Sequence, residues 1–244
     1  MDPSAYTEIY EVENKHWWFI ARRKIIEGVI RSLDLPPESN ILELGAGTGG
    51  NLEMLSRFGK VRAAEMDDYA REMAIKQTGG KFDVQYGCCP EIIPFEGVKF
   101  DLICMFDVLE HIFEDVETLS ALKRRLAPKG RLLITVPAYQ WMWCGHDEFL
   151  HHMRRYTSGE LSRKLRKTGY HVRKITYFNS LLFPLAALVR VKDRLTSKKV
   201  ESVNQLPSPM LNEWLEKIFA CEARLVKNSH LPFGVSLLAI AENT

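Results

Sequence analysis

The residues best suited to chemistry follow a short apolar run, in the segment ILELGAGTGG at positions 41–50. Gly45, Gly47 and Gly49 let the backbone turn tightly and bring its amide groups close to a ligand, because glycine has no side chain to intervene. The same segment satisfies a GxGxxG pattern through Gly50, which is typical of dinucleotide-binding turns. The turn therefore predicts a nucleotide-like ligand and does not by itself identify it.

Two acidic residues near the turn indicate what kind of ligand it takes. Glu65 lies 20 residues after Gly45, at the end of the next apolar run, where a carboxylate can accept hydrogen bonds from both ribose hydroxyls. Glu43 lies two residues before Gly45, inside the first strand. A carboxylate at this position would repel a pyrophosphate, whereas it suits a ligand with an ammonium and a sulfonium. The pair favours S-adenosylmethionine over a nicotinamide dinucleotide.

The elements that must position these residues are short apolar runs that alternate with helical segments. Such alternation produces a parallel sheet covered by helices on both faces. We expect an α/β fold with a Rossmann-like, seven-stranded, mostly parallel sheet whose closing pair contains an antiparallel strand. The expected strands are 41–44, 61–65, 82–86, 100–106, 131–136, 171–178 and 235–241.

The expected sheet consists of a core at 40–180 and a final strand within 231–244. One further segment precedes the core. Apolar residues recur at helical spacing through the first 33 residues, and the Pro36–Pro37 pair ends that helix. Residues 1–39 are therefore expected to form an N-terminal helical cap. A further helix is expected at 51–58, and another begins near Thr157, which has the capping-box partner Glu160.

Residues 181–230 are the least sheet-like part of the chain and are expected to form a helical insertion or lid before the last strand. Helical spacing runs from 211 to 226, after a Lys-rich link at 196–208. The run LLFPLAALV at 181–189 is about half the ~20 residues needed to cross a bilayer. It is followed by basic residues, so it suits peripheral contact with an anionic membrane, and equally packing on the sheet or in a homodimer. These basic residues are Arg190, Lys192, Arg194, Lys198 and Lys199.

Composition narrows the class of protein. The 33 Lys and Arg and 31 Asp and Glu leave a net charge of only +2, so the overall charge does not indicate binding to nucleic acid. The acidic N-terminus lacks the basic start and apolar run of a secretory signal. Five cysteines without a CxxC pair fit a reducing compartment. We therefore expect a cytoplasmic protein without a nucleic-acid partner, and peripheral membrane contact through 181–189 is the alternative.

The order of these segments resembles class I S-adenosylmethionine-dependent methyltransferases of the type 11/12-like kind. The resemblance is carried over 40–137 by ILELGAGTG, Glu65, YGCCPEIIPF and FDLICMFDVLEHI. The segments HWWFIARR at 16–23 and HDEFLHHMRRYT at 146–157 are similar to an unassigned prokaryotic subgroup often linked with cell-surface glycan genes. The resemblance implies an enzyme that moves a methyl group to a small-molecule, glycan or lipid-linked acceptor. A non-catalytic binding protein with the same fold is the alternative, followed by a nicotinamide-dependent enzyme.

The resemblance also implies roles for individual residues toward S-adenosylmethionine. Glu65 would take the ribose hydroxyls, and Met66 would pack on adenine. Cys88 stands where the family often has an Asp, so the adenine contact is expected from the backbone of Cys88 or Cys89. The methionine end would be held by Glu43, Gly45, Ala46, Gly47 and Gly49.

Three further residues are assigned to the reacting end of the cleft. Phe106 and Asp107 would line the methyl-transfer face. Arg22, one helical turn after Trp18, is a candidate for the carboxylate of S-adenosylmethionine, although packing of this helix on the core is the competing interpretation. His111 is a candidate general base, and its competing role is to orient the loop after the fourth strand.

The segment after the fifth strand supplies the remaining candidates. His152 and Tyr156, together with Arg154 and Arg155, could bind or activate the acceptor, because this loop lies over the mouth of the sheet. The alternative is a salt-bridged scaffold that holds the loop. The segment also contains residue types that bind divalent ions, but neighbouring histidines on one loop seldom converge on a single ion, so we expect no metal. These residues are His146, Asp147, His151 and His152.

Overall fold

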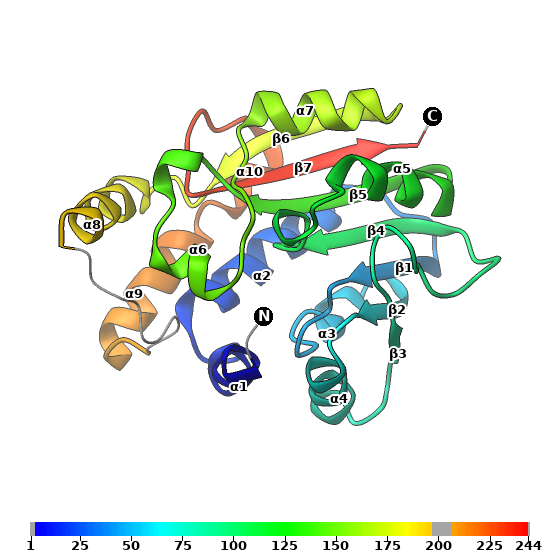
Figure 1. Ribbon diagram of the computed structural model, residues 1–244, viewed down its shortest axis with the longest axis horizontal. Helices are drawn as coiled ribbons and strands as arrows, with labels where there is room; N and C mark the ends of the chain where they lie inside the picture. Colours follow the sequence, from blue (N-terminus) through cyan, green and yellow to red (C-terminus); the bar gives the residue numbers. More distant parts are fainter. Residues whose placement is uncertain (1–2, 197–205, 244) are drawn as a thin grey trace.

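The computed structural model describes residues 3–196 and 206–243, except the side chains of residue 3 and of 193–196. Its seven strands form one sheet in the order β3-β2-β1-β4-β5-β7-β6 (Figure 1). The strands are β1 (Ser39–Leu44), β2 (Gly59–Glu65), β3 (Asp83–Tyr86), β4 (Phe100–Phe106), β5 (Leu126–Pro137), β6 (His171–Phe178) and β7 (Ser236–Glu242).

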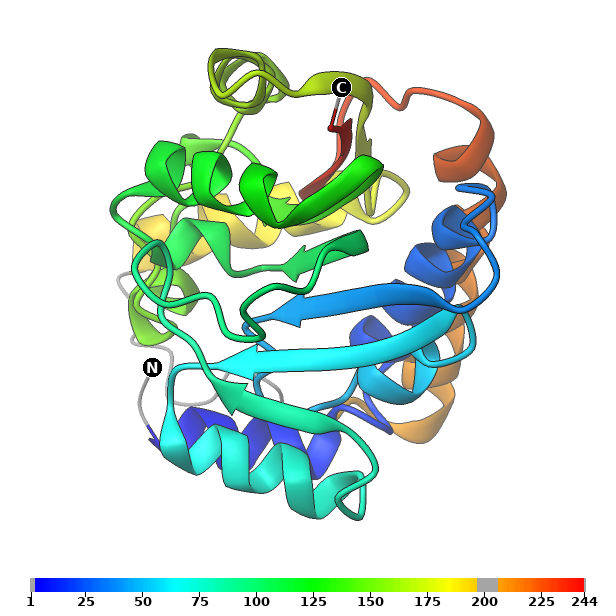
Figure 2. The same ribbon diagram turned by 90° about the vertical axis from the view of Figure 1, so that its right-hand side faces the viewer.

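The first five strands of the chain are parallel, and β7 pairs antiparallel with both β5 and β6. Figure 2 shows β1, β2 and β3 side by side and running in one direction. This arrangement confirms the predicted seven-stranded, mostly parallel sheet with a closing pair. All seven expected strands are present, and β5 extends further toward its N-terminal end than expected.

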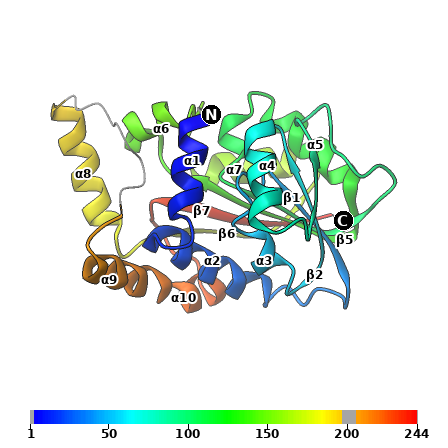
Figure 3. The same ribbon diagram turned by 90° about the horizontal axis from the view of Figure 1, so that it is seen from below.

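Helices cover both faces of the sheet, which explains why its strands are apolar on both sides. One core contains Ile41 with side chains of α2, α3, α4, α9 and α10, and the other contains Leu42 with side chains of α5 and α7. Figure 3 shows α2, α9 and α10 on one side of the sheet and α5 and α7 on the other. The helices are α1 (Pro3–Val12), α2 (Trp17–Ile30), α3 (Leu52–Leu55), α4 (Asp68–Gln77), α5 (Asp115–Arg125), α6 (Gly145–Phe149), α7 (Ser158–Lys167), α8 (Phe183–Thr196), α9 (Pro209–Ala220) and α10 (Ala223–Asn228).

The N-terminal segment forms two helices, which corrects the expectation of one. The chain turns between Val12 and Trp17, and the ring of His16 accepts a hydrogen bond from the backbone N–H of Trp18. The backbone N–H of Trp17 donates to the side chain of Asn212, 2.9 Å away. A partner from α9 thus satisfies the new helix start, and local spacing could not reveal it.

Among its described residues, the segment 181–230 forms three helices, and these have different neighbours. Helix α8 lies toward the carboxyl ends of the parallel strands (Figure 1). Helix α9 packs on α2 instead, where the rings of Trp17 and Phe219 meet edge to face at 5.9 Å and Lys24 pairs with Glu216. Lys198 and Lys199, with much of the Lys-rich link, lie outside the described residues.

Two local expectations have different outcomes. The capping box at the start of α7 is confirmed, because the backbone N–H of Glu160 donates to Thr157 Oγ1 and Thr157 N–H donates back to Glu160 Oε2 at 2.8 Å. The helix expected at 51–58 is shorter and spans Leu52–Leu55. In the part of the chain that the structure describes, no helix has both the length and the apolar character needed to cross a bilayer.

Candidate functional site

A cleft of about 740 Å³ opens at the carboxyl ends of the parallel strands, which is the edge where open α/β sheets bind ligands. Residues from the glycine turn and from the ends of β2 and β4 line its inner part. Residues of α1, α2 and α8 line its outer part, and these helices gather at this edge in Figure 1. The cleft therefore brings together the N-terminal cap, the core and the start of the insertion.

The glycine turn is held by steric constraints that differ from one glycine to the next. Gly45 has φ +68°, and a Cβ placed there would lie 2.4 Å from Val108 Cγ2. Gly47 has φ +54° and open space at its Cβ position, while its N–H donates to Glu65 Oε2 at 2.8 Å. Gly45, Ala46 and Gly47 line the cleft as expected.

Gly49 has a different place from the one expected. Its φ is +90°, and a Cβ there would lie 3.1 Å from Cα and Cβ of Ala74 on α4. Gly49 is not among the described residues that line the cleft. It permits close approach of the turn to α4, so a direct contact with the methionine end is not supported.

Glu65 anchors the end of β2 to the glycine turn. Its carboxylate accepts hydrogen bonds from the backbone N–H groups of Gly47, Met66 and Asp67, at 2.8, 2.9 and 3.0 Å. Burial raises the pKa of Glu65, although these three hydrogen bonds act to lower it. A carboxylate has about four lone-pair sites, and three of them are used here. Glu65 can therefore still accept a hydrogen bond from a hydroxyl group of a ligand in the cleft.

Glu43 is fully buried and only half satisfied. Its Oε1 accepts a hydrogen bond from Asn51 Nδ2 at 2.8 Å, whereas Oε2 has no partner among the described residues. Burial raises the pKa of Glu43 to about 8. Asn51 lines the cleft and Glu43 does not, so Glu43 reaches a ligand through Asn51 or after a small rearrangement.

Replacing Glu43 with Gln is expected to reduce the pH dependence of stability. The folded-state pKa lies above the unfolded value near 4.5, so the contribution of Glu43 is fully present below pH 4.5 and is lost as the pH rises toward 8. The difference in unfolding free energy between wild type and Glu43→Gln, measured by urea titration from pH 4.5 to 8, should shift in favour of the variant. A pH-independent difference would contradict the raised pKa.

Arg22 and Asp107 meet in the cleft. Arg22 Nη2 lies 2.5 Å from Asp107 Oδ2 and donates to Thr135 Oγ1 at 3.1 Å. The guanidinium carbon lies 5.0 Å from the ring centroid of Trp18 and 5.5 Å from that of Phe106. Arg22 Nε has no partner among the described residues, so this arginine keeps a donor for an anionic group.

The expected adenine end is a softer, more exposed part of the cleft. The side chain of Met66 is 57% exposed, and its sulfur lies 4.0 Å from Cys88 Sγ. Both Cys88 and Cys89 line the cleft. Burial raises the pKa of Cys89 to about 12, so its thiol is neutral at physiological pH. This surface can pack against a flat ring without presenting a charge.

The loop after β5 is built around a buried ion pair. Arg155 donates from Nε and Nη2 to the two oxygens of Asp147, at 2.8 and 2.9 Å, and from Nη1 to the carbonyl of Ala138. Asp147 also meets His152 Nδ1 at 2.8 Å. Burial opposes ionisation of Asp147, yet the hydrogen bonds from His152 and Arg155 hold its pKa well below its usual range. These contacts support the scaffold interpretation for Arg155.

Tyr156 does not take the catalytic place expected for it. Its side chain is fully buried in the core with α5 and α7, and its hydroxyl donates to Asp115 Oδ2 at 2.9 Å. Arg154 also pairs with Asp115. Neither residue is among the described residues that line the cleft, because the chain after Arg155 returns to the sheet beside β5.

His111 and His152 do line the cleft, with ring centroids 4.7 Å apart and planes at 80°. Burial and then the neighbouring His152 lower the pKa of His111 to about 3, so its imidazole is neutral. Beside them lies Glu110, whose side chain is fully buried. Burial and then Asp107 raise the pKa of Glu110 well above its usual range.

Three contributors to the cleft were missed by sequence reasoning. Glu110 lies within the DVLEH segment, where only the histidine was considered. Glu13, at the end of α1, accepts hydrogen bonds from Thr48 Oγ1 and Gln77 Nε2 at 2.7 and 2.8 Å and so ties the cap to the glycine turn. His16 also lines the cleft. Glu110 could have been predicted as a cleft residue because it lies within this motif, whereas no local sequence pattern marks Glu13.

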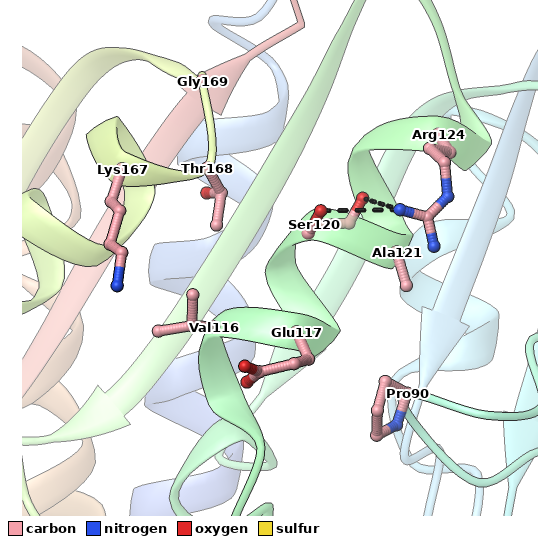
Figure 4. Close-up of a pocket in the computed structure, with 9 residues that line it drawn as sticks. All are labelled: Pro90, Val116, Glu117, Ser120, Ala121, Arg124, Lys167, Thr168 and Gly169. Carbon is pink, nitrogen blue, oxygen red and sulfur yellow. Dashed lines mark hydrogen bonds between the residues drawn. The ribbon is translucent and has the colours of Figure 1, made fainter.

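A second hollow, of about 630 Å³, lies away from the strand ends. It is lined by residues of α5, by Pro90 and by the end of α7 (Figure 4). Arg124 there is hydrogen-bonded to Ser120 on its own helix, and Lys167 and Glu117 do not converge on a common point in the figure. The larger cleft is therefore the candidate site.

Comparison with known proteins agrees with this geometry. Residues 17–175 match a family described as a methyltransferase domain. The chain is 26% identical over 136 residues to a Mycolicibacterium smegmatis protein named "Probable S-adenosylmethionine-dependent methyltransferase". This alignment covers 54% of this chain and 52% of that protein. Over 131 residues it is 27% identical to a glycine/sarcosine/dimethylglycine N-methyltransferase of Actinopolyspora halophila, which covers 48% of this chain and 22% of that protein. The chain thus spans about half, or less, of these relatives.

Solved structures show the same fold. The crystal structure of an S-adenosylmethionine-dependent methyltransferase from Clostridium acetobutylicum superposes with a TM-score of 0.59 at 13% identity, over 91% of this chain and 90% of that one. At this identity the similarity concerns the fold alone.

Proposed function

The chain belongs to the class I S-adenosylmethionine-dependent methyltransferases, and from this membership we propose that it methylates an amphiphilic, lipid-linked acceptor whose apolar part lies along α8. The family match removes the reason to consider a nicotinamide cofactor. The observation that carries the acceptor class is the wall that α8 contributes to the cleft. This wall consists of Leu185, Ala186 and Val189, and Leu182, directly before the helix, lines the cleft with them.

The residues of the cleft fit the cofactor. Glu43 Oε2 is a buried oxygen without a partner, and Arg22 Nε is a buried donor without one, among the described residues. These atoms suit the ammonium and the carboxylate of a methionine group respectively. Glu65 has one lone-pair site left, on Oε2, for a ribose hydroxyl, and Met66 with Cys88 offers a soft surface for adenine. When bound, S-adenosylmethionine supplies a methyl carbon that is activated by the attached sulfonium.

The protein's own contribution to transfer would be alignment and exclusion of water. Phe106 and Asp107 line the inner part of the cleft, and the pair with Arg22 fixes Asp107. Orientation of two reactants can lower a barrier by roughly 7–11 kcal/mol without a strong base. His111 lines the cleft beside them with a neutral imidazole, because burial lowers its pKa.

The surface of α8 supports an acceptor with an apolar part. Leu185 is 56% exposed while lining the cleft, and Leu188, on the same helix, is 70% exposed. Two large apolar residues of α9 are also exposed, Met210 and Trp214. A contiguous exposed apolar patch beside a cleft is typical of a surface that binds an apolar ligand or partner. Peripheral membrane contact and a homodimer involving this surface remain predictions.

S-adenosylmethionine and S-adenosylhomocysteine are expected to raise the melting temperature, whereas NAD and NADP are not, because a ligand stabilises only the folded state that binds it. Glu65→Ala should weaken cofactor binding by about 1.5–3 kcal/mol, the range for hydrogen bonds to a charged group. Calorimetric titration measures this loss, and Gln85→Ala, at an exposed position of β3, serves as the control. Stabilisation by NAD, or unchanged affinity in Glu65→Ala, would contradict the assignment.

Radiolabel from S-adenosylmethionine is expected to enter the lipid fraction of a cell extract when the purified protein is added. Leu185→Asp should reduce this transfer roughly 10- to 100-fold, the equivalent of about 1.5–3 kcal/mol for one buried leucine side chain, while cofactor binding stays unchanged. Leu225→Asp, on α10 outside the cleft lining, is the matched control. Label confined to the aqueous fraction would overturn the acceptor class, and no transfer at all would favour a non-catalytic binding protein.

A further inference from the structure

Three side chains with metal-binding atoms meet in the cleft, apart from the residues assigned to the cofactor. They are Glu110, His111 and His152, and one ligand atom from each lies within 4.8 Å of the other two. His152 Nε2 lies 3.9 Å from Glu110 Oε1. All three residues line the cleft. Two of them follow β4 and the third follows β5, so the cluster forms only when the sheet is assembled.

Glu110 lacks partners to a degree that is unusual for a buried acid. Its side chain is fully buried, and neither carboxylate oxygen has a hydrogen-bond partner among the described residues. An unpaired polar group in the interior costs several kcal/mol, so a native protein normally pairs it with a hydrogen-bond donor, water or an ion. Both free oxygens belong to the residue that meets the two imidazoles.

One of the two histidines, His152, is oriented by a partner on the side away from the cluster. His152 Nδ1 lies 2.8 Å from Asp147 Oδ1, which leaves Nε2 directed to Glu110. Asp147 is itself held by two hydrogen bonds from Arg155. A carboxylate behind a histidine is the usual support of a metal-binding imidazole.

The charges around the cluster leave room for a cation. Arg155 is paired with Asp147, and Arg22 is paired with Asp107, so neither guanidinium is an uncompensated positive charge. The net contribution of the cluster itself is negative once Glu110 is ionised. A divalent ion would therefore satisfy the buried carboxylate without meeting unpaired positive charge.

We propose that Glu110, His111 and His152 bind one divalent transition-metal ion, of which zinc is the representative. Two imidazoles and one carboxylate suit such ions, and three protein ligands leave at least one coordination position open. Because the ligands line the cleft, the open position faces it, where an oxygen atom of the acceptor can bind. This last step rests on the proposed function, whereas binding of the ion does not.

The test is a calorimetric titration of Zn²⁺ into the full chain after treatment with a chelator. We expect about one high-affinity ion per chain, as for a three-ligand protein site. Glu110→Gln and His152→Ala should each lower the affinity at least about tenfold, the scale on which even supporting partners of metal ligands act. His151→Asn is the matched control, because this neighbouring histidine is exposed and has φ +57°, which asparagine tolerates.

Thermal unfolding with and without Zn²⁺ separates loss of the site from loss of the fold. Zn²⁺ should raise the melting temperature of the wild type and of His151→Asn but not of Glu110→Gln. Absence of zinc binding to the wild type, or wild-type affinity in both site variants, would overturn the proposal. If His152→Ala does not fold, Glu110→Gln, which keeps the shape of the side chain, decides alone.

Binding of S-adenosylmethionine, measured in the same metal-free preparations, distinguishes the two proposals. Cofactor binding without zinc binding removes the metal site and leaves the proposed function intact. Zinc binding without cofactor binding or methyl transfer removes the proposed function and leaves the metal site intact.

Discussion

Arg155→Ala is expected to lower the free energy of unfolding by about 3–5 kcal/mol, the range for removing one partner of a buried ion pair. The variant leaves Asp147 buried without either of the two hydrogen bonds that Arg155 donates. His152 and the backbone N–H of Cys144 remain as partners of Asp147 but do not neutralise it fully. Urea unfolding at neutral pH measures the loss as a lower midpoint with an unchanged slope.

Arg154→Ala is the matched control for this change. Arg154 forms a partly exposed ion pair with Asp115, which keeps Lys164 and Tyr156 as partners. Exposed pairs contribute up to about 1 kcal/mol, so this variant should unfold close to the wild type. A folded, equally stable Arg155→Ala protein that lost methyl transfer would mean that Arg155 binds the acceptor and does not serve mainly as a scaffold.

Gly45→Ala is expected to destabilise the protein by about 2–5 kcal/mol and to weaken cofactor binding with it. The left-handed conformation costs a residue with a side chain about 1–2 kcal/mol, and overpacking adds about 1–3 kcal/mol. The overpacking arises because the new Cβ would lie 2.4 Å from Val108 Cγ2 and 2.9 Å from Val108 Cγ1. Denaturation and cofactor titration of the same preparation measure both effects.

Two variants separate the steric part from the conformational part. Gly80→Ala has nearly the same φ, +71°, but no atom within 4 Å of its Cβ position, so it reports the conformational cost alone. Adding Val108→Ala to Gly45→Ala should recover the steric part. If Gly45→Ala costs no more than Gly80→Ala, the contact with Val108 yields easily, and the turn is less constrained than its geometry indicates.

The elements of the core could be predicted because their signals are local. A buried parallel strand reads as a run of apolar residues, and the turn after β1 requires glycine at Gly45 and Gly47 because of their positive φ. The position of Glu65 followed from the length of one strand–helix–strand unit. These features depend on neighbours within about 20 residues, so the sequence alone identified the family and the sheet, and it predicted residues that line the inner part of the cleft.

The acceptor end depended on tertiary contacts that no local pattern contains. Tyr156 and His152 are four residues apart, yet one enters the core beside Asp115 and the other faces the cleft. The break before α2 depends on Asn212, which is 195 positions from Trp17. Side chains of one loop can point in opposite directions, and the packing of the loop on the sheet decides which side chain faces the cleft.

The charges of the cleft illustrate the same division. The sequence contains Glu110, His111 and His152, but their spacing does not say that they meet, because 40 residues and the whole of β5 separate the last two. Their proximity results from β4 and β5 being neighbours in the sheet, which brings the loops after both strands to one edge. The sequence by itself determined which strands form and which glycine turn is expected to bind a nucleotide-like cofactor. Only the tertiary structure decided which side chains share the acceptor end, because burial and pairing there arise between segments distant in the chain.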